Sequence, residues 1–178
     1  WSSDVCSSDL NAAQKNRWMP DLISGKLRIA AALYEADARY AFERVATHAE
    51  RTPRGYVISG QKSLVLHGET AQLFLVLART SGAVDTRDGL SLFAIQANTP
   101  GVRIEGFDTL DGRRAARVSL THVEVALDRL VGTAGDAARH VDFALDAATA
   151  ALCAEAVGAV DALISLTAEH LRTRQQFG

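Results

Sequence analysis

The most constraining feature of this sequence is a long proline-free stretch from Asp136 to Arg174 that contains a single glycine, Gly158. Its apolar residues recur at intervals of three, four and seven positions. They are Val141, Leu145, Leu152, Ala156, Ala159, Leu163 and Leu166. This spacing puts them on one face and predicts a single α-helix. At about 1.5 Å per residue, the helix would be on the order of 55–60 Å long.

Alanines occupy much of the opposite side of this predicted helix, so it requires neighbours on more than one face. A β domain of about 100 residues is too small to supply them all. The sequence ends at Phe177-Gly178, where a glycine would normally cap a helix before the next element. We therefore expect the helix to be the first member of a bundle, and the chain to be an incomplete piece of a longer protein.

Short apolar segments separated by turn residues fill the region from Lys26 to about Gly132. The predicted strands are 27–33, 43–48, 55–58, 63–67, 73–79, 90–97, 102–107 and 114–125, with turns at glycines that include Gly60 and Gly68. Several strands at this spacing are typical of an all-β barrel or sandwich. The expected fold class is α+β. Residues 11–25 end a helical domain, 26–133 form the β domain, and 134–178 begin a C-terminal helical domain.

The first ten residues, Trp1–Leu10, read WSSDVCSSDL and show neither helical nor strand periodicity. We interpret them as a non-native addition or a disordered tail and exclude them from the predicted fold. The segment Asn11–Ser24 has the pattern of a helix end, in which Pro20 either breaks the helix or opens a short turn.

Composition and charge narrow the function classes. The net charge is −2 and the 19 basic residues are scattered, so nothing indicates binding to nucleic acid or an anionic membrane. The longest uncharged apolar stretches are far below the ~20 residues that span a bilayer, so no membrane span is expected. Cys6 and Cys153 lack metal-ligand spacing, which indicates no metal site and favours a reducing, cytoplasmic location.

Five short strings occur in the order found in one enzyme family. They are Gly60-Gln61-Lys62, Leu73–Thr80 (LFLVLART), Asp111–Arg114 (DGRR), Leu130-Val131-Gly132 and Arg174–Gly178 (RQQFG). Each is weak alone, but together they resemble the acyl-CoA dehydrogenases over Asn11–Gly178. Finer strings resemble the branch called the pimeloyl-CoA dehydrogenase small subunit. These are Arg39-Tyr40, Val65–Gly68 (VLHG) and Leu152–Gly158 (LCAEAVG).

The resemblance implies an FAD-dependent α,β-dehydrogenation of an acyl-CoA thioester, in which a base removes the α-proton and the flavin accepts the β-hydride. It also implies an electron-transfer flavoprotein or similar acceptor, and a dimer or tetramer. Most relatives carry the catalytic Glu beyond the position of Gly178, and a minority carry it where this sequence has Ala148. We therefore expect no catalytic residue within the chain.

The resemblance assigns two flavin-contacting segments, and this sequence departs from the family pattern in both. The family's Leu-Thr-Glu-Pro-Gly-x-Gly-Ser corresponds to Leu33–Tyr40 (LYEADARY). Leu33 and Tyr34 are expected to contact the flavin, and Tyr40 the substrate, with phenols in place of small hydroxyls. The family's Trp-Ile-Thr corresponds to Leu64-Val65-Leu66, where Leu66 cannot donate the hydroxyl hydrogen bond expected near flavin N5. Without the resemblance, both segments read as ordinary strands and loops.

At the C-terminal end, the resemblance assigns Arg174, Gln176 and Phe177 to the FAD of a neighbouring subunit. A guanidinium suits a pyrophosphate because it is always charged and can bond bidentately. The alternative is an exposed arginine favoured by the helix dipole. Asp146 matches a substrate-contacting Asp of the family, although the family's following Arg is replaced by Thr149.

Three functions remain open from the sequence. The first is an acyl-CoA dehydrogenase. The second is a non-catalytic partner subunit of a heteromeric dehydrogenase, suggested by the departures at Tyr34, Ala36 and Leu66. The third is a β-sandwich ligand-binding module with a helical stalk, which explains the strands but not the ordered strings.

Overall fold

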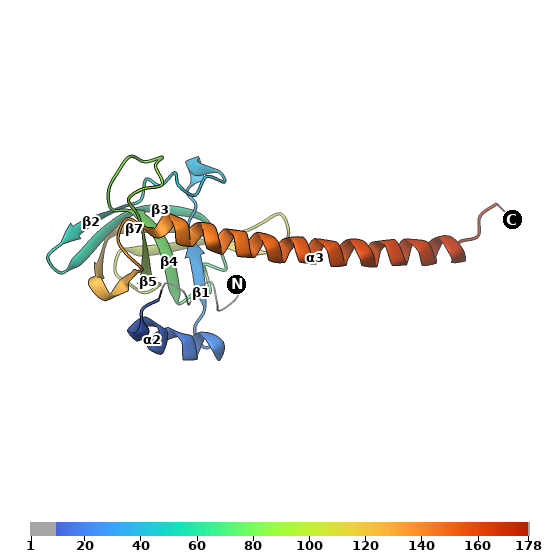
Figure 1. Cartoon of the computed structure of the whole chain (residues 1–178), viewed down its shortest axis with the longest axis horizontal. Helices are drawn as coiled ribbons and strands as arrows, with labels where there is room; N and C mark the ends of the chain where they lie inside the picture. The colour runs from blue at the N-terminus through green and yellow to red at the C-terminus, as the bar shows by residue number, and fades with distance from the viewer. Residues whose placement is uncertain (1–9, 178) are drawn as a thin grey trace.

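The structure, a computed structural model, describes residues 10–177 (Figure 1). Its helices are α2 (Ala12–Ile23), α3 (Ala137–Thr173) and the short 3-10 turns η1 (Ala36–Ala38) and η2 (Leu127–Arg129). Its strands are β1 (Ile29–Ala32), β2 (His48–Thr52), β3 (Gly55–Leu66), β4 (Leu73–Arg79), β5 (Leu90–Gln96), β6 (Val102–Asp108), β7 (Arg114–Ala126) and β8 (Leu130–Val131). The expected α+β fold, a β domain followed by one long helix, is confirmed.

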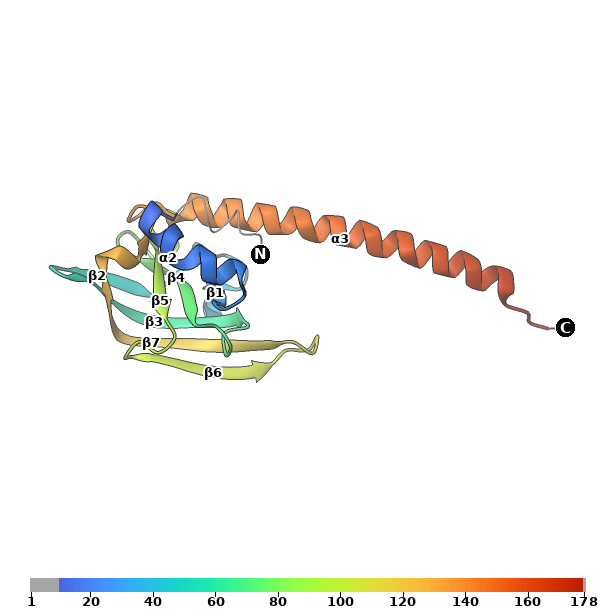
Figure 2. The same ribbon diagram turned by 90° about the horizontal axis from the view of Figure 1, so that it is seen from below.

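One mixed sheet contains all the strands, in the order β6-β7-β3-β2-β4-β5-β8, with β1 parallel to β4. The sheet has two halves, since β2 meets β4 only at the pair His48–Arg79. One half contains β2, β3, β6 and β7, and the other contains β1, β4, β5 and β8. Figure 2 shows the long β3, β6 and β7 lying beneath β4 and β5, as in a sandwich.

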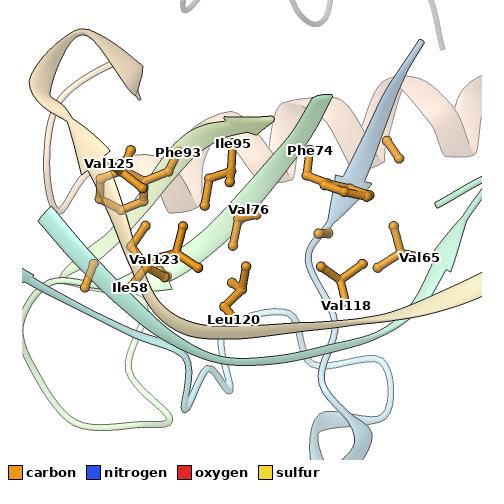
Figure 3. Packing of buried hydrophobic residues seen from close by; sticks show 14 of the residues in the cluster. Ile58, Val65, Phe74, Val76, Phe93, Ile95, Val118, Leu120, Val123 and Val125 are labelled. Atoms are coloured by element: carbon orange, nitrogen blue, oxygen red, sulfur yellow. The ribbon is translucent and has the colours of Figure 1, made fainter. Parts of the chain in front are cut away.

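The first hydrophobic core lies between the two halves (Figure 3). Phe74 and Val76 of β4, with Phe93 and Ile95 of β5, face apolar residues of β3 and β7. These are Ile58, Val65, Val118, Leu120, Val123 and Val125. The alternation of buried and exposed residues along β7 follows from its single core-facing side.

The other face of β4 and β5 carries a second core. Leu73 and Leu77 of β4 lie there with Trp18 of α2 and with Ala137 and Val141 at the start of α3. Because β4 and β5 are covered on both faces, their sequences are almost continuously apolar rather than alternating.

Beyond its first turns, α3 leaves the β domain and projects away from it (Figure 1). Of its described residues only Ala137 and Val141 are buried, and large apolar side chains lie exposed along its length. Examples are Leu152 at 64%, Leu163 at 62% and Leu171 at 69% exposure. The expected exposed apolar helix is therefore observed.

The expectation of no membrane span stays a prediction. By length and composition alone α3 could cross a membrane, since an 18-residue window within it has a mean hydropathy of 1.6. Counting uncharged runs missed this because Glu155 and Asp161 interrupt a segment whose average is still apolar. The same composition belongs to a helix that packs within a bundle on several faces.

Four local predictions were wrong. The strand expected at 43–48 begins only at His48. Gly60 lies inside β3, where 55–58 and 63–67 join in one strand, and not in a turn. A Cβ there would lie 2.4 Å from the Thr47 hydroxyl oxygen, so glycine allows a close approach of the two segments. Pro20 lies within α2, which continues to Ile23.

The fourth concerns Leu10, which was assigned to the tail but is buried in the second core. Residues 1–9 of the predicted tail lie outside the described part of the chain. The helix that follows is anchored by Gln14, whose side-chain amide donates to the carbonyls of Asp128 (2.9 Å) and Leu130 (2.8 Å). This anchor and the buried Trp18 explain why α2 persists through its proline.

The segment expected as a strand at 43–48 is held by a side chain instead. Arg79, at the end of β4, is buried, and its guanidinium donates to the carbonyls of Glu43 (2.8 Å) and Val45 (3.1 Å). It also donates to the carbonyls of Asp88 (3.0 Å), Val84 (3.1 Å) and Thr86 (2.9 Å). One buried cation thus fixes residues 43–45 and the loop between β4 and β5.

We expect Arg79→Met to destabilise the protein by about 2–3 kcal/mol, because five carbonyls, one of them in a buried hydrogen bond, lose their donor at once. Urea unfolding would measure it. Arg117→Met is the matched control: Arg117 is half-exposed on β7, and its ion pair with Glu105 is 3.6 Å long. The control should change stability by no more than about 0.5 kcal/mol. An equally small effect of Arg79→Met would contradict the proposed clamp.

Candidate functional site

Two segments that are far apart in sequence meet at the C-terminal end of β1. Leu33 and Tyr34 follow directly after β1, and the Tyr34 carbonyl accepts a hydrogen bond from the Ser63 amide of β3 at 2.9 Å. The structure therefore brings the first predicted flavin segment beside the second, Leu64-Val65-Leu66.

The Leu64-Val65-Leu66 segment alternates between surface and core. Leu64 and Leu66 are 51% and 44% exposed, whereas Val65 is fully buried in the first core. The register of β3 against β7 shifts between Lys62 and Val65, and Leu64 adopts a positive φ of 51°. Such irregularities re-aim side chains, often next to functional sites.

We call the region where the backbone of Leu33 and Tyr34 meets the exposed side chains of Leu64 and Leu66 the ledge. The Leu33 side chain itself is buried in the second core, and Tyr34 packs against that core. The side chains of these residues are apolar except for the partly buried Tyr34 hydroxyl, and burial raises the pKa of that phenol. Val65 lies beneath the ledge and has no exposed surface, so it supports the ledge without reaching a ligand.

A buried ion pair lies directly behind the ledge. Lys62 is fully buried, and its ammonium donates to Glu35 Oε1 at 2.8 Å and to the Leu33 carbonyl at 3.1 Å. The Glu35 carboxylate also accepts hydrogen bonds from the backbone amides of Ala46 (2.8 Å) and Thr47 (3.0 Å). From the sequence, Lys62 was recognised only as part of the string Gly60-Gln61-Lys62. A lysine on the side of a strand that faces the core needs a buried partner, and this could have indicated the ion pair.

The two members of the pair shift each other's ionisation. Burial lowers the pKa of Lys62 to about 8, even though the neighbouring Glu35 carboxylate raises it and Arg79 lowers it a little further. For Glu35, burial alone would raise the pKa. The charge of Lys62 and the hydrogen bonds from Lys62 and Thr47 outweigh this and hold the pKa below its usual value.

The remaining predicted site residues do not join the ledge. Tyr40 follows η1 and is 93% exposed. Asp146 is exposed on α3. Arg174 follows the last turn of α3, and Gln176 and Phe177 lie exposed beyond it, at the far end of the projecting helix (Figure 1).

The ledge fits one face of a flavin ring in part. Its exposed leucines offer an apolar cover for a planar aromatic system, and the Tyr34 hydroxyl is a possible donor. Leu66 has no group that can donate to the ring. The residues thus fit FAD as a platform and lack one hydrogen bond that the family pattern supplies.

We expect an NMR titration of lysine side chains to show one resonance with a pKa near 8, which disappears in Lys62→Met. In Glu35→Gln the pKa should fall further, since the carboxylate that favours the charged form is gone. Because the folded pKa lies below the unfolded value, the neutral amine favours folding. The contribution of Lys62 to stability should therefore rise between pH 8 and about 10.5. An unshifted lysine at every position would refute the buried pair.

Comparisons with known proteins agree with this architecture. Residues 30–126 match the family described as acyl-CoA dehydrogenase, middle domain. The chain is 28% identical to acyl-CoA dehydrogenase fadE12 of Mycobacterium bovis, over 91% of this chain and 42% of that protein. The chain thus spans less than half the length of this relative.

Two solved structures show the same fold. The FAD complex of PigA superposes with a TM-score of 0.91 at 24% identity, over 98% of this chain and 46% of that one. The ChsE4-ChsE5 complex from Mycobacterium tuberculosis gives a TM-score of 0.74 at 20% identity, over 80% and 37%. The family match covers more than half of the described chain and includes all of β1 except Ile29, all of β3, and the ledge between them. This chain belongs to the acyl-CoA dehydrogenase family.

Proposed function

We propose that the protein containing this chain is an FAD-dependent acyl-CoA dehydrogenase that oxidises an acyl-CoA thioester at its α and β carbons. The observation that carries the proposal is the family's middle domain over residues 30–126, and the contact between the Ser63 amide and the Tyr34 carbonyl within it supports the predicted flavin segments. A bound flavin would supply the redox chemistry. The ledge residues would cover one ring face and exclude water from it.

The same proposal makes the chain a piece of a longer protein. Its support is the exposed apolar length of α3 and the coverage of less than half of fadE12. A large uncovered apolar surface on a protein normally marks a missing partner. On this proposal the other helices of a bundle cover α3. The proposal also includes an acyl-CoA substrate and an electron-transfer flavoprotein or similar acceptor. It further includes a dimer or tetramer and a cytoplasmic location.

A second candidate is a partner subunit of a heteromeric dehydrogenase that frames a flavin without supplying the base. It is favoured by Leu66 and by the exposed Tyr40, which replace the family's hydroxyls. The finer resemblance to the pimeloyl-CoA dehydrogenase small subunit belongs to this candidate. A structural neighbour, ChsE4-ChsE5, is itself described as a complex of two differently named chains. The β-sandwich module with a helical stalk leaves the family match unexplained.

The isolated chain should bind FAD weakly or not at all. Arg174, Gln176 and Phe177 lie at the end of a helix of 37 residues, about 55 Å from its start, so they cannot contribute to the ledge of their own chain. The purified chain should therefore lack the visible absorbance of a bound flavin. Stoichiometric FAD held tightly by a monomer would show that the site is misplaced.

No carboxylate of α3 should be the catalytic base. The reaction needs a carboxylate within hydrogen-bond reach of the substrate α-carbon, and the family's position on this helix is Ala148. Asp146 and Glu155 lie two and seven residues from it, on a different face or about two turns along. In the full-length protein, Asp146→Asn and Glu155→Gln should keep proton abstraction with saturating acyl-CoA and a dye acceptor. Any effect of Asp146→Asn, at the predicted substrate contact, should fall on KM and not on kcat. Loss of proton abstraction in either variant, with flavin and substrate still bound, would show that a carboxylate of α3 is the catalytic base.

A further inference from the structure

One side chain joins the three segments around the ledge. The Lys62 ammonium belongs to β3 and bonds the Leu33 carbonyl at the exit of β1. It also bonds Glu35, whose carboxylate holds the amides of Ala46 and Thr47. Residues 33–35, 46–47 and 62–66 are thus tied to a single buried cation.

Stability alone is a weak reason for such a pair. Taking two charges out of water is costly, and buried ion pairs replaced by apolar residues often leave a protein as stable or more so. Lys62 is also the last residue of β3 paired in register before the shift that re-aims Leu64. Its side chain therefore acts at the point where the ledge departs from regular strand geometry.

We propose that Lys62 is a positioning residue, which holds the exit of β1 against β3 so that the backbone of Leu33 and Tyr34 and the exposed Leu64 and Leu66 lie side by side as a platform for the cofactor. The identity of the ligand, a flavin, rests on the proposed function. The geometry around Lys62 is observed in the chain itself and is independent of the proposed function. Lys62 does not reach the ligand, because it has no exposed surface.

The hydrogen bond to Leu33 separates this role from simple charge neutralisation. If Lys62 only balanced Glu35, removing both charges together would restore the site. If Lys62 positions the ledge, the double variant still loses the bond to the Leu33 carbonyl. The adjacent contact from the Ser63 amide to the Tyr34 carbonyl should then loosen.

Two groups with charge act on Lys62 from the surrounding elements, Glu35 before η1 and Arg79 at the end of β4. Its pKa near 8 means that the ammonium loses its proton just above neutral pH. A neutral amine can still donate to Leu33 and Glu35. The ledge should therefore keep its geometry up to about pH 9, although Lys62 loses its positive charge over this range.

Hydrogen exchange in the 178-residue chain tests the geometry without any cofactor. Lys62→Met, and the charge-free double variant Glu35→Gln with Lys62→Met, should speed exchange of the Ser63 amide about tenfold or more. The Leu77 amide, in the β4–β5 ladder, serves as the internal reference and should change little. Lys26→Met, at an exposed position, is the matched lysine control and should leave both amides unchanged.

Two results would overturn the proposal. One is unchanged Ser63 exchange in the double variant. The other is an equal acceleration at Leu77, which would mean that Lys62 supports only global stability. If Lys62→Met does not fold because Glu35 is left unpaired, the double variant alone decides the outcome.

The ligand is tested separately in the full-length protein by FAD titration. The double variant should weaken FAD binding about tenfold, whereas Lys26→Met should not. Unchanged FAD affinity beside a loosened ledge would overturn the cofactor part of the proposal. A wild-type full-length protein that binds no FAD would refute the proposed function and leave the exchange result standing.

Discussion

The burial of β4 and β5 on both faces is the constraint on which the rest of this structure depends. One face packs against β3 and β7 in the first core, and the other packs against α2 and the start of α3. A strand buried on both faces has no solvent-facing side for polar residues, so its sequence is almost continuously apolar. The central pair also determines the position of β1, which pairs in parallel with β4. The residues after β1 then contact β3 through the hydrogen bond from the Ser63 amide to the Tyr34 carbonyl. The ledge is therefore a consequence of how the central pair is covered.

Two buried cations fix the loops around this central pair in different ways. Arg79 presents a planar fork with five donors, and carbonyls of two loops satisfy them. Lys62 has a compact ammonium with three donors, and it donates hydrogen bonds to one carboxylate and one carbonyl. Arginine suits the wide loop arrangement, whereas lysine suits the narrow space behind the ledge. The pKa of Lys62 is lowered to about 8, so only this cation loses its charge close to neutral pH.

The sequence predicted the long helix and most strands because periodicity and turn residues are local signals. The sequence-based prediction failed where contacts between residues far apart in the chain determine the local conformation. The carbonyls of Glu43 and Val45 have a side chain as their donor, which no local pattern reveals. Gly60 was taken for a turn, although its role is to let β3 approach Thr47. The strings around Leu33 and Leu64 predicted neighbouring segments and the structure brings them together. The bond from Lys62 to Leu33, across 29 residues, needed the fold itself.

The length of α3 separates the chain's two sets of proposed cofactor residues. The ledge lies on the β domain, while Arg174, Gln176 and Phe177 lie beyond a helix of 37 residues that projects away from it (Figure 1). A rigid helix of about 55 Å cannot fold back on itself without a break, and α3 contains no proline. If both sets contact flavins, each flavin must therefore receive them from different chains. On the proposed function, the exposed apolar side chains along α3 are covered by the other helices of a bundle, and their burial is favourable at about 25 cal/mol per Å².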